Sequence, residues 1–182
     1  MTQRPFIVVS GLPASGKTTV GSRLAAALRL PLLDKDDILE ALFETAGPVD
    51  AEKRSQLSRA SDVVLARLSA ASSGAVLVSH WRHASSLEDS GTPIEFLRSL
   101  STQIVEVHCV CPPEIAVQRF TSRQRHPGHN DGERAPRLVA QFQHLAGQGP
   151  LGIGRTVVVR TDRPFDFDFV AENVRTALAT ED

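Results

Sequence analysis

One stretch near the start of the chain restricts its fold more than any other. Residues 11–18 read GLPASGKT and fit the pattern G-x-x-x-x-G-K-[ST] at every specified position. They follow the apolar residues 6–9 and precede a segment with apolar residues at helical spacing. A strand, a glycine-rich turn and a helix in this order place backbone N–H groups around phosphate oxygens. The stretch therefore predicts a nucleotide-phosphate site.

Each part of this loop has an expected role in holding a nucleotide. The glycines let the backbone curl around the anion, and the following helix points its positive dipole end at it. The Lys17 ammonium can reach the β- and γ-phosphates, and the Thr18 hydroxyl can bind Mg²⁺. The residues of the loop predicted to bind the nucleotide are Gly11, Ala14, Ser15, Gly16, Lys17, Thr18 and Thr19.

Composition argues against several other classes of protein. The 182 residues are 41% hydrophobic and 23% charged with a net charge of −1, which indicates one globular domain over residues 1–182 and gives no basic field for nucleic acid or a membrane surface. Cys109 and Cys111 would share one face of a strand, a poor geometry for a disulfide. We expect them to be small buried residues, with a metal pair as the alternative. No signal peptide or membrane span is evident, so we expect a cytoplasmic protein.

Apolar strands alternate with helical segments along the whole chain. We predict strands at residues 6–10, 32–33, 75–78, 104–111 and 156–159, each followed by at least one helix. Near-continuous apolar strands in this order indicate an α/β fold with a five-stranded parallel sheet and helices on both faces. In such folds ligands bind at the carboxyl ends of the strands. The residues directly after each strand are therefore the candidates for a site.

With these residues in place, the chain resembles the small P-loop kinases of the nucleoside-monophosphate-kinase-like group. This group includes shikimate and gluconate kinases, chloramphenicol phosphotransferase and the kinase domain of phage polynucleotide kinase. The resemblance covers nearly the whole chain, although only the loop at residues 11–18 is a specific motif. It implies a three-layer P-loop NTPase fold, Mg-ATP as the donor, and an arginine-bearing lid at about residues 119–135.

The acidic segment after the second strand resembles a motif of several of these kinases. By position, Asp36 matches the carboxylate that accepts the proton of the acceptor hydroxyl, and Asp34 matches a residue near the magnesium ion. The alternative is that these carboxylates cap the next helix, a role for which Asp37 is the expected residue.

Arginines after the fourth strand resemble those of the family's lid. A spacing of four would put Arg119 and Arg123 on one helical face, suited to adenine stacking and to the γ-phosphate respectively, with Arg125 beyond them. The alternative is a solvated basic helix end. Arg163, after the fifth strand, matches the loop that flanks adenine. His126 and His129 are expected on the lid surface.

The chain departs from the common P-loop pattern after its third strand. Ser79 stands where many relatives carry a carboxylate for magnesium, so either Ser79 or Asp34 would serve instead. His80, Trp81 and Arg82 follow and are predicted to contact the acceptor. The indole would suit a ring-bearing compound and the guanidinium an anionic group, whereas plain packing is the alternative for the aromatic residues.

Together these features predict an ATP- and Mg²⁺-dependent phosphotransferase that moves the γ-phosphoryl group to a hydroxyl of a small-molecule acceptor. Lys17, Asp36 and Arg123 would be catalytic, and Thr18 and Asp34 would bind the metal. One alternative is a 5′-hydroxyl polynucleotide kinase, against which stands the lack of a basic stripe. The other is an ATP-binding switch module with slow hydrolysis. The sequence names neither the acceptor nor an oligomeric state.

Overall fold

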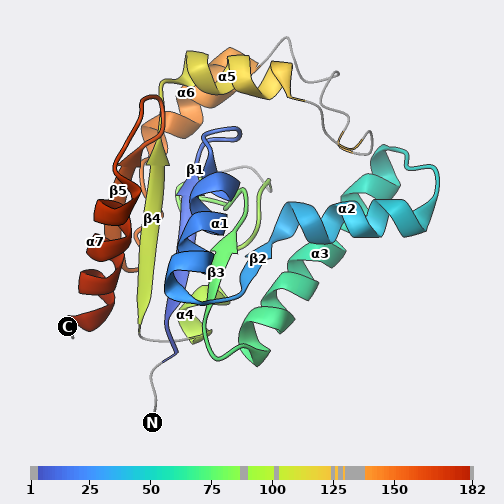
Figure 1. Cartoon of the computed structure of the whole chain (residues 1–182). Helices are drawn as coiled ribbons and strands as arrows, with labels where there is room; N and C mark the ends of the chain where they lie inside the picture. Colours follow the sequence, from blue (N-terminus) through green and yellow to red (C-terminus); the bar gives the residue numbers. More distant parts are fainter. Residues whose placement is uncertain are drawn as a thin grey trace.

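A five-stranded, all-parallel sheet forms the centre of the molecule in the computed structural model (Figure 1). The structure describes residues 4–86, 90–100, 103–123, 126, 129 and 138–180. The strand order is β2-β3-β1-β4-β5, so the strand that leads into the phosphate loop lies in the middle. The strands are β1 Phe6–Gly11, β2 Leu32–Asp34, β3 Ala75–Val78, β4 Ile104–Val110 and β5 Arg155–Arg160.

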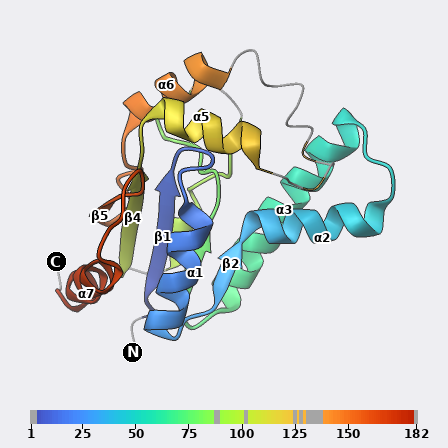
Figure 2. The same ribbon diagram turned by 45° about the horizontal axis from the view of Figure 1, so that its top comes forward.

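Helices cover both faces of the sheet, which gives the three layers that the sequence predicts. Helices α1 and α7 pack on one face, and α3 and α4 pack on the other. Helices α5 and α6 lie over the carboxyl ends of the central strands, as Figures 1 and 2 show. The helices are α1 Lys17–Leu28, α2 Lys35–Ala46, α3 Ala51–Ala71, α4 Leu97–Leu100, α5 Pro113–Ser122, α6 Leu138–Gln148 and α7 Phe167–Ala179.

Alternation along β1 explains why this strand must lie between two helical layers. Ile7 and Val9 point into the core beneath α1 and α7, whereas Phe6 and Val8 point into the core beneath α3 and α4. All four side chains are fully buried, which is typical of a central parallel strand. The next residue on the second face is Ser10, which is polar and marks the point where the core gives way to the site.

The predicted α/β fold and the five strands are confirmed, with small differences in the helices. The helix expected over residues 94–100 is only the single turn of α4. Helix α5 ends at Ser122, so the prediction that Arg119 and Arg123 share a helical face is wrong: Arg123 has extended backbone angles. No helix in the described part of the chain is long and apolar enough to cross a membrane. The extent of the single domain stays a prediction.

Candidate active site

The loop between β1 and α1 has a backbone that ordinary residues seldom adopt. Gly11, Ala14 and Gly16 have φ angles of 128°, 58° and 88°. A Cβ atom at Gly11 would collide with the carbonyl oxygen of Cys109, so only glycine fits there. Ala14 takes the left-handed conformation without being glycine, which costs on the order of 1 kcal/mol. Such strain persists where the surrounding structure and a function require the loop shape.

Two polar side chains of this loop are poised for an anion. The Ser15 hydroxyl oxygen is fully buried and has no hydrogen-bond partner among the described residues. The Lys17 ammonium donates to the carbonyl oxygens of Gly11 and Leu12 at 3.0 and 2.7 Å. Burial lowers the pKa of Lys17 from its ordinary value, while the charges of Asp34 and Asp36 act in the opposite direction. An incoming phosphate would satisfy the hydroxyl and neutralise the ammonium.

Asp34 connects the phosphate loop to the start of α2. Its Oδ2 accepts a hydrogen bond from the Thr18 hydroxyl at 2.8 Å, and its Oδ1 accepts one from the Asp36 backbone N–H at 2.9 Å. Asp34 is therefore the helix cap, and the prediction that Asp37 takes this role is wrong. Burial raises the pKa of Asp34 to about 6. A hydroxyl and a carboxylate at this distance are hard oxygen ligands of the kind that Mg²⁺ prefers.

The predicted catalytic carboxylate, Asp36, lies exposed in the first turn of α2. The residue before it holds this turn in place. Lys35 is buried, forms an ion pair with Asp62 of α3 at 2.7 Å, and also donates to Ser58. Because the backbone of Lys35 leads directly into Asp36, the ion pair restrains the position of the predicted base.

The same ion pair extends to the segment after β3. The Thr92 hydroxyl donates to Asp62 at 2.7 Å and lies 2.6 Å from the hydroxyl of Ser79. Both hydroxyls are buried. Ser79 is thus engaged in a structural chain of hydrogen bonds, and Asp34, bonded to Thr18, is the better placed of the two candidates for the magnesium shell.

The predicted lid arginines contact different partners. Arg119 donates from Nη2 to the carbonyl oxygen of Thr161 at 2.8 Å, and Thr161 in turn donates to the carbonyl oxygen of Ser15 at 2.6 Å. These two hydrogen bonds connect α5, the segment after β5 and the phosphate loop. The Arg123 guanidinium lies over the Phe120 ring at 4.5 Å, and its charge lowers the pKa of the already desolvated Lys17.

The remaining lid and adenine-side predictions have mixed outcomes. Arg125 lies outside the described residues, and Arg163 is exposed after β5. The expectation that His126 and His129 lie on the lid surface is wrong for His129, while His126 is half-buried. His129 is buried and lies 2.9 Å from Glu40, while both rings contact Phe43 of α2. Helix α2 therefore provides a docking point for these two histidines. Thr19 is exposed in the first turn of α1.

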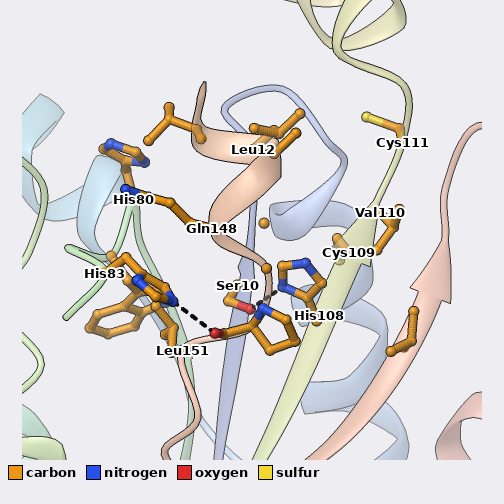
Figure 3. Close-up of a pocket in the computed structure, with 17 residues that line it drawn as sticks. Ser10, Leu12, His80, His83, His108, Cys109, Val110, Cys111, Gln148 and Leu151 are labelled. Atoms are coloured by element: carbon orange, nitrogen blue, oxygen red, sulfur yellow. Dashed lines mark hydrogen bonds between the residues drawn. The ribbon is translucent and has the colours of Figure 1, made fainter. Parts of the chain in front are cut away.

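Beneath the phosphate loop, a cavity of about 330 Å³ opens on the face of the sheet away from α1 (Figure 3). Its wall comes from the ends of β1 and β4, the segment after β3, the end of α6, the segment that joins α6 to β5, and Val158 of β5. The lining residues are Ser10, Gly11, Leu12, His80, Trp81, His83, His108, Cys109, Val110, Cys111, Leu145, Ala146, Gln148, Gly149, Pro150, Leu151 and Val158.

Of the predicted acceptor residues, two line this cavity. His80 lies at its wall, and Trp81 lines it while its indole N–H donates to the carbonyl oxygen of Val9 at 2.9 Å. Trp81 is thus both a packing residue and part of the wall. Arg82 is absent from the described lining and donates to the carbonyl oxygen of Gly91 at 3.3 Å. Cys109 and Cys111 are free and buried, as expected.

Sequence reasoning missed the polar residues of β1 and β4 at this cavity. Glu106 is fully buried in β4 and accepts hydrogen bonds from Ser10 and from the backbone N–H groups of Leu151 and Gly152. His108 lies 2.8 Å from the Ser10 hydroxyl. The signal that could have found them was a charged residue inside an otherwise apolar strand, since such a residue is buried only with partners.

Known proteins provide a further line of evidence. The profile of the family AAA_33, described as an AAA domain, matches residues 6–145. Curated relatives align over short segments. Shikimate kinase of Corynebacterium glutamicum is 45% identical over 49 residues, which are 26% of this chain and 29% of that protein. Shikimate kinase of Corynebacterium jeikeium is 61% identical over 36 residues, 20% of each chain. The chain thus aligns with less than a third of the length of these relatives.

Solved structures match over nearly the whole chain. A protein from Chloroflexus aurantiacus j-10-fl has a TM-score of 0.73 at 28% identity and covers 97% of both chains. Shikimate kinase from Acinetobacter baumannii, solved in complex with shikimate, has a TM-score of 0.60 at 20% identity over 96% of this chain and 93% of that one. The second likeness shows the fold alone.

Proposed function

The chain belongs to the AAA_33 family of AAA domains, and from that premise we propose that it is a kinase acting on a small molecule. The reaction is transfer of the γ-phosphoryl group of ATP to a hydroxyl of the acceptor. Relatives named as shikimate kinases support this reaction class. We also propose that it works in a reducing cytoplasm, which the two free buried thiols support.

One observation carries the donor half of this proposal. The loop after β1 combines left-handed backbone at Ala14 and Gly16 with the fully buried hydroxyl of Ser15, which has no partner in the described part of the chain. A buried polar atom without a partner is costly, and a phosphate oxygen would supply the missing partner. Backbone N–H groups from Ala14 to Lys17 and the Lys17 ammonium would hold the β- and γ-phosphates.

Thr18 and Asp34 would hold Mg²⁺ together with phosphate oxygens. Within the described chain no group of three histidine, cysteine or acidic side chains could hold a metal by itself, which suits an ion that keeps several waters and binds mainly through phosphates. The ion would supply charge neutralisation to the transferred group. The ionised form of Asp34 is the one that such a cation favours.

Asp36 would orient the acceptor hydroxyl and accept its proton. Its exposed position at the start of α2 leaves the carboxylate accessible, and its charge acts on that of Lys17. The oxygen of the acceptor would then form a bond to the γ-phosphorus as the bond to ADP breaks. Arg123 would stabilise the negative charge of the transferred group, since its charge reaches the phosphate loop and lowers the pKa of Lys17. Arg119 and Arg163 would flank the adenine.

The test is a coupled ADP-release assay with Mg-ATP across a library of acceptors. The library should contain sugar acids, nucleosides, aminoglycosides, ring-bearing alcohols and an oligonucleotide with a 5′-hydroxyl end. We expect one class to stimulate ADP release and Asp36→Asn to abolish that stimulation. Slow ATP turnover that no acceptor stimulates, unchanged in Asp36→Asn, would instead identify a switch module. Stimulation by the oligonucleotide would identify a polynucleotide kinase.

A further inference from the structure

The cavity beneath the phosphate loop is lined by polar and apolar side chains but, in its described part, by no acidic or strongly basic residue. None of the described residues that line it is Asp, Glu, Lys or Arg. The wall is formed by aliphatic side chains, the Trp81 indole, three histidines and two cysteines, with Ser10 and Gln148 as further polar groups. A ligand carboxylate placed there would lose water without gaining a cationic partner from these residues, which is unfavourable. The lining suits an uncharged, partly apolar compound.

The wall of this cavity is fixed by internal hydrogen bonds. Both oxygens of the buried Glu106 carboxylate are engaged by the segment after α6, at 2.8 Å from Leu151 N–H and 3.1 Å from Gly152 N–H. On the other side, His83 lies 3.0 Å from the carbonyl oxygen of Pro150 through Nε2 (Figure 3). A carbonyl only accepts, so His83 donates from Nε2 and accepts from Ser85 through Nδ1. The site is therefore formed before any ligand arrives.

Hydrogen bonding also determines which nitrogen of His108 carries a proton. The Ser10 hydroxyl donates its single proton to Glu106 at 2.6 Å. The Ser10 oxygen can then only accept from His108, so Nδ1 of the ring is protonated. The other ring nitrogen, Nε2, is left as an acceptor at the cavity and has no partner among the described residues; it points away from Ser10 in Figure 3. Burial lowers the pKa of His108, which keeps the ring neutral.

The cavity adjoins the place where the phosphoryl group would be held. Lys17 donates to the carbonyl oxygens of Gly11 and Leu12, and both of these residues also line the cavity. The charge of Lys17 lowers the pKa of His108 in the cavity wall, and the charge of Asp36 raises the pKa of Lys17. The cavity thus borders the two residues that hold the ammonium, while Lys17 itself is not among the described residues of the lining.

We propose that this cavity binds the ring of an uncharged alcohol acceptor, with a hydroxyl or N–H group of that ring donating a hydrogen bond to His108 Nε2. This inference rests on the proposed kinase function and specifies its substrate class. The acceptor is then unlike shikimate or gluconate, whose carboxylates the described lining does not match. Trp81 forms the aromatic part of the wall, and Glu106 acts as a positioning residue through the segment that it anchors.

The test is a binding titration that does not depend on turnover. Trp81 is the single tryptophan of a chain without tyrosine, so its fluorescence reports on the cavity. The probes are two matched pairs: shikimate with methyl shikimate, and 4-(hydroxymethyl)benzoate with its methyl ester. We expect each neutral ester to bind at least about tenfold more tightly than its acid, because only the acid must bury a charge. Acids that bind as tightly as their esters, or esters that give no saturable response, would overturn the inference.

Two histidine variants give the matched control. His108→Leu should weaken ester binding about five- to tenfold, the scale of one lost hydrogen bond, whereas His144→Leu, on the exposed part of α6, should leave it unchanged. Unchanged ester affinity in His108→Leu would contradict the assigned contact. If esters bind as expected but are never phosphorylated, the kinase proposal fails and the cavity preference stands. If the acids are phosphorylated instead, the kinase proposal stands and this inference fails.

Discussion

The phosphate loop and the cavity below it use polar groups in opposite ways. In the loop, the Ser15 hydroxyl is buried without a hydrogen-bond partner among the described residues, and Ala14 holds a strained backbone angle. In the cavity wall, Glu106 is equally buried, yet the described structure gives its two oxygens three hydrogen bonds. The loop hydroxyl therefore lacks a partner until an anion binds, whereas the buried carboxylate of the wall has its partners without a ligand.

This difference indicates how the two halves would divide the reaction. The donor side concentrates charge in Lys17, Asp34 and Asp36, where phosphate and a cation would meet it. The described lining of the cavity contains no Asp, Glu, Lys or Arg and is preformed, so it would select by shape and by single hydrogen bonds. Variants on the charged side should mainly change the rate of transfer, and variants on the neutral side should mainly change acceptor affinity.

The largest effect is expected at Lys17. Lys17→Ala removes the ammonium that would hold the γ-phosphate and should lower kcat by about 10²–10³-fold. Lys17→Arg should restore little, since the planar guanidinium does not fit a site built for a compact ammonium. Steady-state ADP release measures both. Full activity in Lys17→Ala would show that the phosphate loop takes no part in the transfer, which contradicts the role given to the charged side of the site.

Asp36→Asn comes next and tests the other charged group. Loss of the proton acceptor should lower kcat by about 10²-fold while acceptor KM changes little. Asp37→Asn is the matched control, because Asp37 lies in the same helical turn and should leave kcat within a few-fold. Equal losses in the two variants would mean that the helix start, and not one carboxylate, matters.

A moderate effect is expected at Asp62 of α3, the ion-pair partner of Lys35. Asp62→Ala leaves the buried Lys35 without its ion-pair partner and Thr92 without its acceptor. We expect the free energy of unfolding to fall by about 3 kcal/mol, and kcat to fall with it as the Asp36 turn loosens. Urea denaturation and ADP release measure the two quantities, and Asp62→Asn, which keeps the Thr92 bond, should be intermediate. A stability loss with kcat unchanged would show that the ion pair does not position Asp36.

The smallest effect is expected at Asp34, where substitution should raise the free energy of unfolding, unlike Asp62→Ala. Its pKa of about 6 exceeds the ordinary value of 3.8, so the ionised form costs folding free energy that is fully present above pH 6 and absent below pH 3.8. Without Mg²⁺, Asp34→Asn should therefore be more stable than the parent by about 1–2 kcal/mol near neutral pH, and the gap should close near pH 4. Thermal melts at the two pH values measure this. A destabilised variant at neutral pH would show that the Thr18 and helix-cap bonds outweigh burial.

The phosphate loop and the cavity also differ in how much of each could be predicted from the sequence. The loop from Gly11 to Thr18 is a local feature, since its angles and its lysine are set within eight consecutive residues. The apolar runs likewise predicted the five strands, because a buried parallel strand needs apolar side chains on both faces.

The cavity could not be predicted in this way. Ser10, His83, His108 and Gln148 come from four separate segments, and only the strand order brings them together. The predictions that were wrong near the phosphate loop depended on where a strand or helix ends. Asp34 caps α2 in place of Asp37 because β2 ends at Asp34, and Arg123 leaves the face of Arg119 because α5 ends one residue earlier.

The central claim is that the phosphoryl group of ATP passes directly to an acceptor oxygen at this edge of the sheet. The most direct test incubates the protein with ATP labelled with ¹⁸O on the γ-phosphate and with a stimulating acceptor, followed by mass spectrometry of the acceptor. The account predicts a phosphorylated acceptor that carries all the non-bridging ¹⁸O of the γ-phosphate in the parent and almost none of this product in Asp36→Asn. Labelled inorganic phosphate as the sole product, at equal rates in the two proteins, would contradict it.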